Sequence, residues 1–203
     1  MMNHDFYILV NPGHLGNLCA IYECFMQKRF LLHICCGPCV IAILEELKRN
    51  FEVTAYYYNP NIHPKEEYEK RKAEVIKICE EMAVPFIEGG YNPVDWFKLA
   101  DEYKDEPEGG ERCRRCFAMR LEETAKYAVA NGFDYFSCTL TSGRNKKADI
   151  INPLGVEVGR KYGVKFYEEN WKKRGRQDAS RILCQERGVY RQHYCGCVYS
   201  KLV

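Results

Sequence analysis

The sequence predicts a single-domain α/β protein with a doubly wound, mostly parallel, Rossmann-like sheet and a cysteine-rich C-terminal tail. Short apolar or β-branched runs alternate with stretches of helical spacing 10 to 19 residues long, and this alternation is typical of parallel β-α units. The chain has 203 residues and shows no repeat, low-complexity stretch or long linker. We therefore expect one α/β domain over residues 30–203, preceded by an N-terminal extension over residues 1–29.

Three strands and three helices are expected in the first half of this domain. An apolar run over 30–35 ends at a Gly-Pro pair, and helical spacing follows over 40–49. Residues 51–58 are rich in β-branched and aromatic side chains, and residues 65–82 form a charged amphipathic pattern. A third strand over 85–88 precedes a Gly-Gly pair and a short helix over 94–103.

The second half continues the pattern. A helix is expected over 112–130, closed by Asn131-Gly132, and strands over 135–140 and 164–167 flank a helix over 148–162. Ligands of such sheets lie beyond the carboxyl ends of the strands. Residues that follow strand ends are therefore the first candidates for a site.

Seven of the twelve cysteines fall in three clusters, which are Cys35, Cys36 and Cys39, then Cys113 and Cys116, then Cys195 and Cys197. We interpret them as a metal site assembled from three distant segments, because closely spaced thiols serve few other purposes. Cys79 and Cys138 are expected to be core residues, and no function is assigned to the solitary Cys19, Cys24 and Cys184.

Composition places the protein among soluble, cytoplasmic domains. Hydrophobic residues make up 46% and charged residues 29%, no apolar run approaches the roughly 18 residues of a membrane span, and the N-terminus lacks the basic region of a signal peptide. The net charge is only +2, yet bases outnumber acids 10 to 4 between Arg160 and Arg191. Lys172, Lys173, Arg174 and Arg176 of that region would suit phosphate contacts, although a solvated face explains them equally well.

The spacing of the thiols favours metal binding. Cys113 and Cys116 would lie on one helix face, where the helix dipole and flanking arginines favour thiolates. Cys35 and Cys36 can face one centre only if the Gly37-Pro38 bend follows them. Four thiolates satisfy zinc, whereas an iron-sulfur cluster, with or without an additional iron, uses more; we rank iron-sulfur first, zinc second and disulfide chemistry third.

Polar residues near the same strand ends are candidate substrate contacts. Asn59, Asn61 and His63 lie in one turn-rich segment and Glu106 in another, while Arg191 and Tyr194 in the tail suit stacking and phosphate binding to single-stranded RNA. Turn chemistry and core packing explain these residues as well.

Four motifs, in order, resemble the cobalamin-independent epoxyqueuosine reductases. They read HICCGPC, YNPNIHP, EPEGGERCRRCFAMRL and YRQHYCGC, and the resemblance runs from about Phe30 to the C-terminus. It implies reduction of epoxyqueuosine to queuosine in a tRNA anticodon, the last step of queuosine synthesis. It also implies a 4Fe-4S cluster, a low-potential electron donor, and Cys35, Cys36, Cys113 and Cys116 as first-choice ligands, with Cys195 and Cys197 as further ligands or a redox pair. His63 and Glu106 would be candidate proton donors.

Two alternatives remain open. A tRNA-thiolating enzyme of the nucleotide-hydrolase-like superfamily (HUP type) would share this sheet, but it should carry a glycine-rich phosphate loop where this chain has His33-Ile34-Cys35-Cys36. A zinc-stabilised RNA-binding module would explain the thiols and the basic region without catalysis.

Overall fold

Five parallel strands form one sheet in the order β3-β2-β1-β4-β5. The structure is a computed structural model that describes residues 27–200. β1 (Lys28–His33) lies at the centre between β2 (Phe51–Tyr57) and β4 (Tyr135–Cys138), and the edges are β3 (Phe86–Glu88) and β5 (Lys165–Phe166). The predicted parallel α/β architecture is confirmed.

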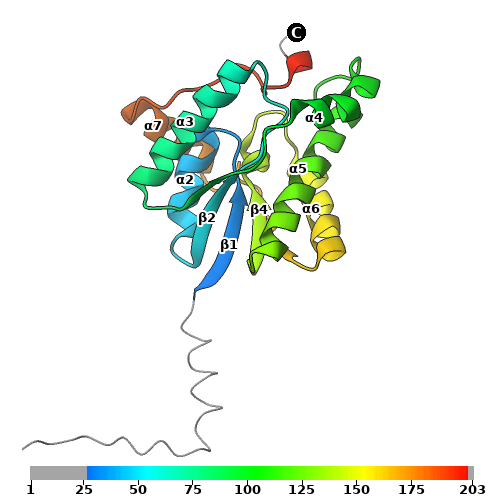
Figure 1. Ribbon diagram of the computed structural model, residues 1–203. Helices are drawn as coiled ribbons and strands as arrows, with labels where there is room; N and C mark the ends of the chain where they lie inside the picture. The colour runs from blue at the N-terminus through cyan, green and yellow to red at the C-terminus, as the bar shows by residue number, and fades with distance from the viewer. Residues whose placement is uncertain (1–26, 201–203) are drawn as a thin grey trace, which may run out of the picture.

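Helices cover both faces of the sheet (Figure 1). α2 (Gly37–Leu47), α3 (Lys65–Glu81) and α7 (Arg176–Glu186) lie on one side, and α5 (Glu111–Ala130) and α6 (Ala148–Tyr162) on the other, with α4 (Pro93–Ala100) packed on α5. Phe30 and Leu32 of β1 belong to the core of the first face and Leu31 to that of the second. A strand covered on both faces requires a continuous apolar run, which explains its sequence.

The structure differs from the predicted elements in three places. The short helix divides into α4 and a 3-10 turn, η2 (Asp101–Tyr103), and β4 ends early because η3 (Thr139–Ser142) follows it. The whole of α7 was not predicted. A last 3-10 turn, η4 (Val198–Ser200), ends the described tail, and none of the helices over residues 27–200 is long and apolar enough to cross a membrane.

The strand order reverses direction at the central strand. The chain moves outward from β1 through β2 to β3 and then returns to the other side of β1 for β4 and β5. The segments that follow β1 and β4 therefore diverge, and such a switch point is where open α/β sheets bind ligands.

Candidate metal centre

Three cysteines just beyond β1, namely Cys35, Cys36 and Cys39, form a cluster that we call the first thiol group. The sulfur atoms of Cys35, Cys36 and Cys39 all lie within 4.8 Å of one another, and Cys35 Sγ is 3.8 Å from Cys36 Sγ. The predicted bend is present, since Cys36 has extended backbone and α2 starts at Gly37. A Cβ on Gly37 would lie 2.9 Å from Glu74 Cγ, so a larger residue would require the Glu74 side chain to shift where α2 packs on α3. Cys39 was absent from the predicted ligand set, although its spacing already placed it in the cluster.

The second thiol group combines α5 with the tail. Cys113 and Cys116 line one pocket together with Cys195 and Cys197, as the helical spacing and the resemblance led us to expect. The backbone N–H of Gly109 donates to Cys113 Sγ at 3.2 Å. The other residues that line this pocket are Asn61, Trp96, Arg112, Phe117 and Arg120.

Contacts with α3 and the segment after β2 hold the tail in place. The Arg71 guanidinium donates to the backbone carbonyls of Cys195 and Tyr194, at 2.9 and 3.1 Å, and the N–H of His63 donates to the carbonyl of Gly196 at 2.8 Å. Gly196 has φ of 108°, and an added Cβ would lie 2.9 Å from Ile62. Only glycine fits here, and its turn brings both tail cysteines to the pocket.

Two cations connect the thiol groups electrostatically. Burial lowers the pKa of the Arg120 guanidinium, but negative charge on Cys116, Cys35 and Cys195 outweighs it and raises that pKa overall. Burial opposes the Lys146 ammonium in the same way, and Cys195 and Cys35 raise its pKa above the ordinary value. Thiols of both groups therefore act on the charge of these two cations. Sequence reasoning missed both residues, although Arg120 lies four positions after Cys116 and hence on the same helix face.

The pKa values of the thiols differ between the groups. Hydrogen bonds with Cys36 and Cys39 hold the pKa of Cys35 well below its ordinary value, and the bond with Cys35 raises that of Cys39 to about 12. Burial raises the pKa of Cys113 and of Cys116. The expectation that the helix start would favour these two thiolates is therefore wrong for the metal-free chain, because desolvation outweighs the nearby positive charge.

A buried polar network lies behind the thiols. Asn59 is fully buried, and its amide donates to the carbonyl of Ile34 at 2.8 Å and accepts from Arg120 at 2.7 Å. It is therefore no substrate contact, contrary to expectation, because both ends of its side chain are occupied. His33 Nε2 lies 2.9 Å from the carbonyl of Tyr58, and burial lowers the pKa of His33 to about 3, so this imidazole is neutral.

The other candidates from the two turn-rich segments are placed differently. Asn61 is buried, lines the second pocket, and its Oδ1 has no hydrogen-bond partner among the described residues. The His63 ring packs on Trp96 and Phe97, and burial lowers its pKa. Glu106 lies in the exposed loop before α5, where its carboxylate accepts from the N–H of Glu111 at 3.4 Å, and it does not line the pocket.

The predicted phosphate-binding run is only partly available. Arg176 is 6% exposed and its guanidinium is bonded to Glu46 and Glu169, so it is a structural ion pair and not a surface cation, contrary to expectation. Lys172 is half-buried and donates to the carbonyls of Arg144 and Lys146, at 3.2 and 2.6 Å. The other two residues, Lys173 and Arg174, are exposed.

The two predicted substrate contacts in the tail, Arg191 and Tyr194, differ in their exposure to solvent. Arg191 is exposed, whereas Tyr194 is half-buried, donates its hydroxyl to the carbonyl of His63 and places its ring 5.1 Å from the Arg71 guanidinium. Tyr194 thus packs the tail on the domain. Among the remaining cysteines, Cys79, Cys138 and Cys184 are buried, as expected for core residues, and Cys19 and Cys24 lie outside the described residues.

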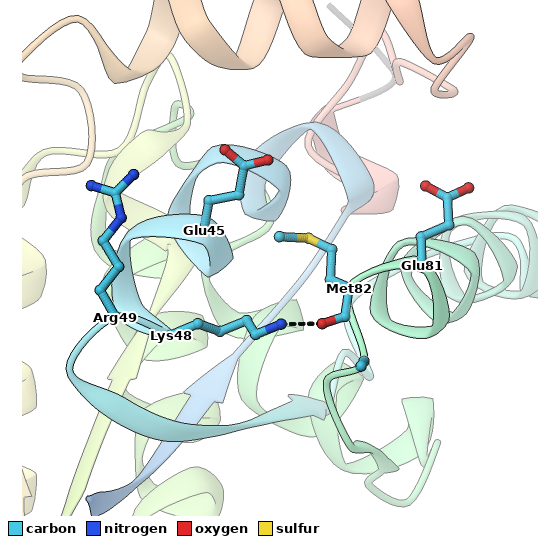
Figure 2. A pocket seen from close by; sticks show the side chains of 6 residues that line it. Glu45, Lys48, Arg49, Glu81 and Met82 are labelled. Carbon is cyan, nitrogen blue, oxygen red and sulfur yellow. Dashed lines mark hydrogen bonds between the residues drawn. The ribbon is translucent and has the colours of Figure 1, made fainter.

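A wider hollow lies elsewhere, between the C-terminal ends of α2 and α3 (Figure 2). It is lined by Glu45, Lys48, Arg49, Glu81, Met82 and Ala83, and Lys48 donates to the carbonyl of Met82. Acids and bases balance here and no thiol takes part. The hollow therefore does not contribute to the metal centre.

Comparison with known proteins points to one family. The family model described as epoxyqueuosine reductase QueH matches residues 30–202. The chain is 40% identical over 181 residues to epoxyqueuosine reductase QueH of Streptococcus pyogenes serotype M1, and this alignment covers 86% of this chain and 71% of that protein. It is 37% identical over 175 residues to epoxyqueuosine reductase QueH of Thermotoga maritima, and this alignment covers 85% of this chain and 90% of that protein.

One solved structure is similar in fold. The U34-tRNA thiolase NcsA from Methanococcus maripaludis, with its [4Fe-4S] cluster, has a TM-score of 0.56 and 14% sequence identity, covering 86% of this chain and 62% of that chain. At this identity the likeness concerns the fold alone.

Proposed function

The chain belongs to the epoxyqueuosine reductase QueH family, and from this premise we propose that it reduces epoxyqueuosine to queuosine in the anticodon of a tRNA. The reaction breaks both C–O bonds of the epoxide and forms a C=C bond. Two electrons and two protons are consumed, and the oxygen leaves as water. Within the structure, the observation that carries the proposal is the gathering of seven cysteines, four buried and three half-buried, into two groups of thiols.

The donor set fits an iron-sulfur centre. Three sulfurs within 4.8 Å of one another and four more around one pocket exceed the needs of a single tetrahedral zinc. One buried polar atom at that pocket, Asn61 Oδ1, has no hydrogen-bond partner among the described residues. Buried groups of this kind require an explanation such as a bound ion or substrate.

We assign Cys35, Cys36, Cys113 and Cys116 as ligands of a 4Fe-4S cluster, with Cys39, Cys195 and Cys197 available to an additional iron or as a redox pair. When bound, such a centre supplies electrons at low potential and a Lewis-acidic iron for the epoxide oxygen.

The chain itself would handle substrate and protons. Asn61 is placed to orient a polar group of the modified base, and His63 is the better of the two proposed proton donors because it packs on Trp96 of the pocket, whereas Glu106 lies in an exposed loop. The electrons would come from a low-potential donor in the cytoplasm.

Anaerobic purification followed by iron, acid-labile sulfide and zinc analysis tests the cofactor. The reduced protein is then incubated with tRNA that contains epoxyqueuosine, and nucleosides are analysed. Cys36→Ala and Cys116→Ala should abolish both cluster and queuosine formation, whereas Cys79→Ala, in the core of α3, should retain them. A colourless protein with stoichiometric zinc would instead support the RNA-binding module, and no conversion with any low-potential donor would refute the reductase.

A further inference from the structure

Arg120 is a buried cation with an unusual set of partners. Its side chain is 1% exposed, it donates to the Asn59 amide oxygen at 2.7 Å, and its Nε lies 3.4 Å from Nε2 of the neutral His33 ring. No ion pair joins it to a carboxylate within residues 27–200. Two other buried arginines pair with carboxylates, Arg71 with Glu67 and Arg176 with Glu46. Arg112, which lines the same pocket, donates only to the backbone carbonyls of Tyr103, Lys104 and Glu106.

A buried guanidinium without a counter-charge is costly. Four cysteines line the pocket beside Arg120, and negative charge on Cys116, Cys35 and Cys195, in that order, acts on the guanidinium. The neutral imidazole of His33 and the amide of Asn59 fix the guanidinium from behind without cancelling its charge. The partner that this site lacks would be a metal centre whose net charge, counted together with its thiolate ligands, is negative.

We propose that Arg120 is a positioning residue that supplies the counter-charge of the thiolate-bound metal centre and so raises its reduction potential. A fixed positive charge in a desolvated site favours the reduced, more negative state of the centre. The inference rests on the proposed function only in requiring an iron-sulfur centre, and not in requiring a particular substrate.

Redox titration of the anaerobically purified protein tests this directly. Arg120→Met should shift the potential to more negative values and Arg120→Lys, which keeps the charge, should shift it less. Arg176→Met is the matched control, because it also removes a buried arginine, yet one paired with Glu46 away from the thiols. It should lower thermal stability and leave the potential unchanged.

Each outcome decides. A loaded Arg120→Met protein with unchanged potential overturns the proposal. If Arg120→Met is folded, as judged by circular dichroism, but takes up no iron while Arg120→Lys does, the positive charge is required and the proposal stands. If neither variant takes up iron, the geometry of the guanidinium is required instead of its charge, and the proposal is refuted. Wild-type protein that holds the cluster but does not reduce epoxyqueuosine refutes the proposed function and leaves the test of Arg120 intact.

A second inference concerns the loop after β4, and a different observation carries it. Arg144 and Lys147 are exposed, and Lys172 holds the loop between them by donating to the carbonyls of Arg144 and Lys146. The carbonyl of Asn145 also faces Gly109, whose N–H contacts Cys113. The loop is thus a fixed, basic rim beside the thiols.

We infer that this rim contacts the phosphates of the anticodon stem-loop, an inference that rests on the proposed function. Binding of a tRNA anticodon stem-loop is measured against salt concentration. Arg144→Gln with Lys147→Gln should weaken binding several-fold and reduce the log-log salt slope by about 0.7 to 0.9 per lost phosphate contact. The matched double variant Arg49→Gln with Lys77→Gln removes two exposed charges at the C-terminal ends of α2 and α3 and should leave the slope unchanged. Equal slopes for the two double variants overturn this inference, whatever the catalytic activity.

Discussion

Arg71 is the residue on which docking of the cysteine tail depends most. Its side chain is 1% exposed, Nε donates to Glu67 at 2.7 Å, and the two terminal nitrogens donate to the carbonyls of Cys195 and Tyr194 at 2.9 and 3.1 Å. Arg71→Met keeps most of the apolar stem but removes every one of these bonds.

The size of the loss follows from these contacts. Removing one partner of a buried ion pair costs about 3 to 5 kcal/mol. Glu67 is 12% exposed and keeps the Tyr190 hydroxyl at 3.0 Å, which favours the lower half of that range. We expect a loss of about 3 to 4 kcal/mol, and at about 2 to 4 °C per kcal/mol for a chain of this size the melting midpoint should fall by roughly 6 to 16 °C.

Urea unfolding and calorimetry measure the stability of the reduced, metal-free protein. Alkylation followed by peptide mass spectrometry reports on the tail, and Cys195 and Cys197 should react several-fold faster in Arg71→Met, while the core thiol of Cys79 should not. Lys72→Met, one residue along α3, removes partly exposed ion pairs with Glu69 and Glu88 and should cost less than about 1 kcal/mol. A similarly small loss for Arg71→Met, with alkylation unchanged, would refute the reasoning.

Two further predictions concern the framework. Gly159→Ala in α6 would place a Cβ 2.6 Å from the carbonyl oxygen of Val164. It should lower the free energy of unfolding, measured by urea titration, by about 1 to 3 kcal/mol despite the better helix propensity of alanine. Gly90→Ala, whose Cβ would have no atom within 4 Å, should change the free energy of unfolding by less than about 0.5 kcal/mol. Arg176 holds the pKa of Glu46 below its ordinary value of 4.5, so the ionised carboxylate stabilises the fold above that pH and this contribution is lost as pH falls through the folded-state pKa. The stability difference between wild type and Glu46→Gln should therefore be larger at pH 7 than at pH 3, and equal differences would contradict the assignment.

The sequence allowed the fold to be predicted where the signal is local. β1 was recognisable because it carries a continuous apolar run, and β2 because it is rich in β-branched and aromatic side chains. α5 was recognisable because its helical pattern runs over many residues and ends at Asn131-Gly132. α7 was missed because its first residues continue the basic run Lys172 to Arg176, which was interpreted as a surface. Arg176 is buried against Glu46, 130 positions away, and no local pattern indicates that contact.

Among the site residues, too, some positions follow from local sequence patterns and others only from tertiary contacts. The convergence of Cys113 and Cys116 follows from their spacing on one helix, which the sequence contains. The role of Asn59 does not, because its partners are Ile34 in the segment after β1 and Arg120 in α5. The position of Asn59 after a predicted strand suggested a substrate contact, whereas its tertiary contacts make it part of the support for Arg120.

Completion of the second thiol group requires tertiary contacts as well as spacing. α5 supplies Cys113 and Cys116 from a helix whose buried face packs in the core, but Cys195 and Cys197 reach the pocket only when the tail is held by Arg71 and turned at Gly196. A metal bound by residues from both segments would stabilise the docked tail, and a docked tail would in turn raise metal affinity, because binding to one conformation shifts the equilibrium toward it. Tail docking and metal occupancy are therefore thermodynamically linked, and Arg71, which touches no thiol, should influence both.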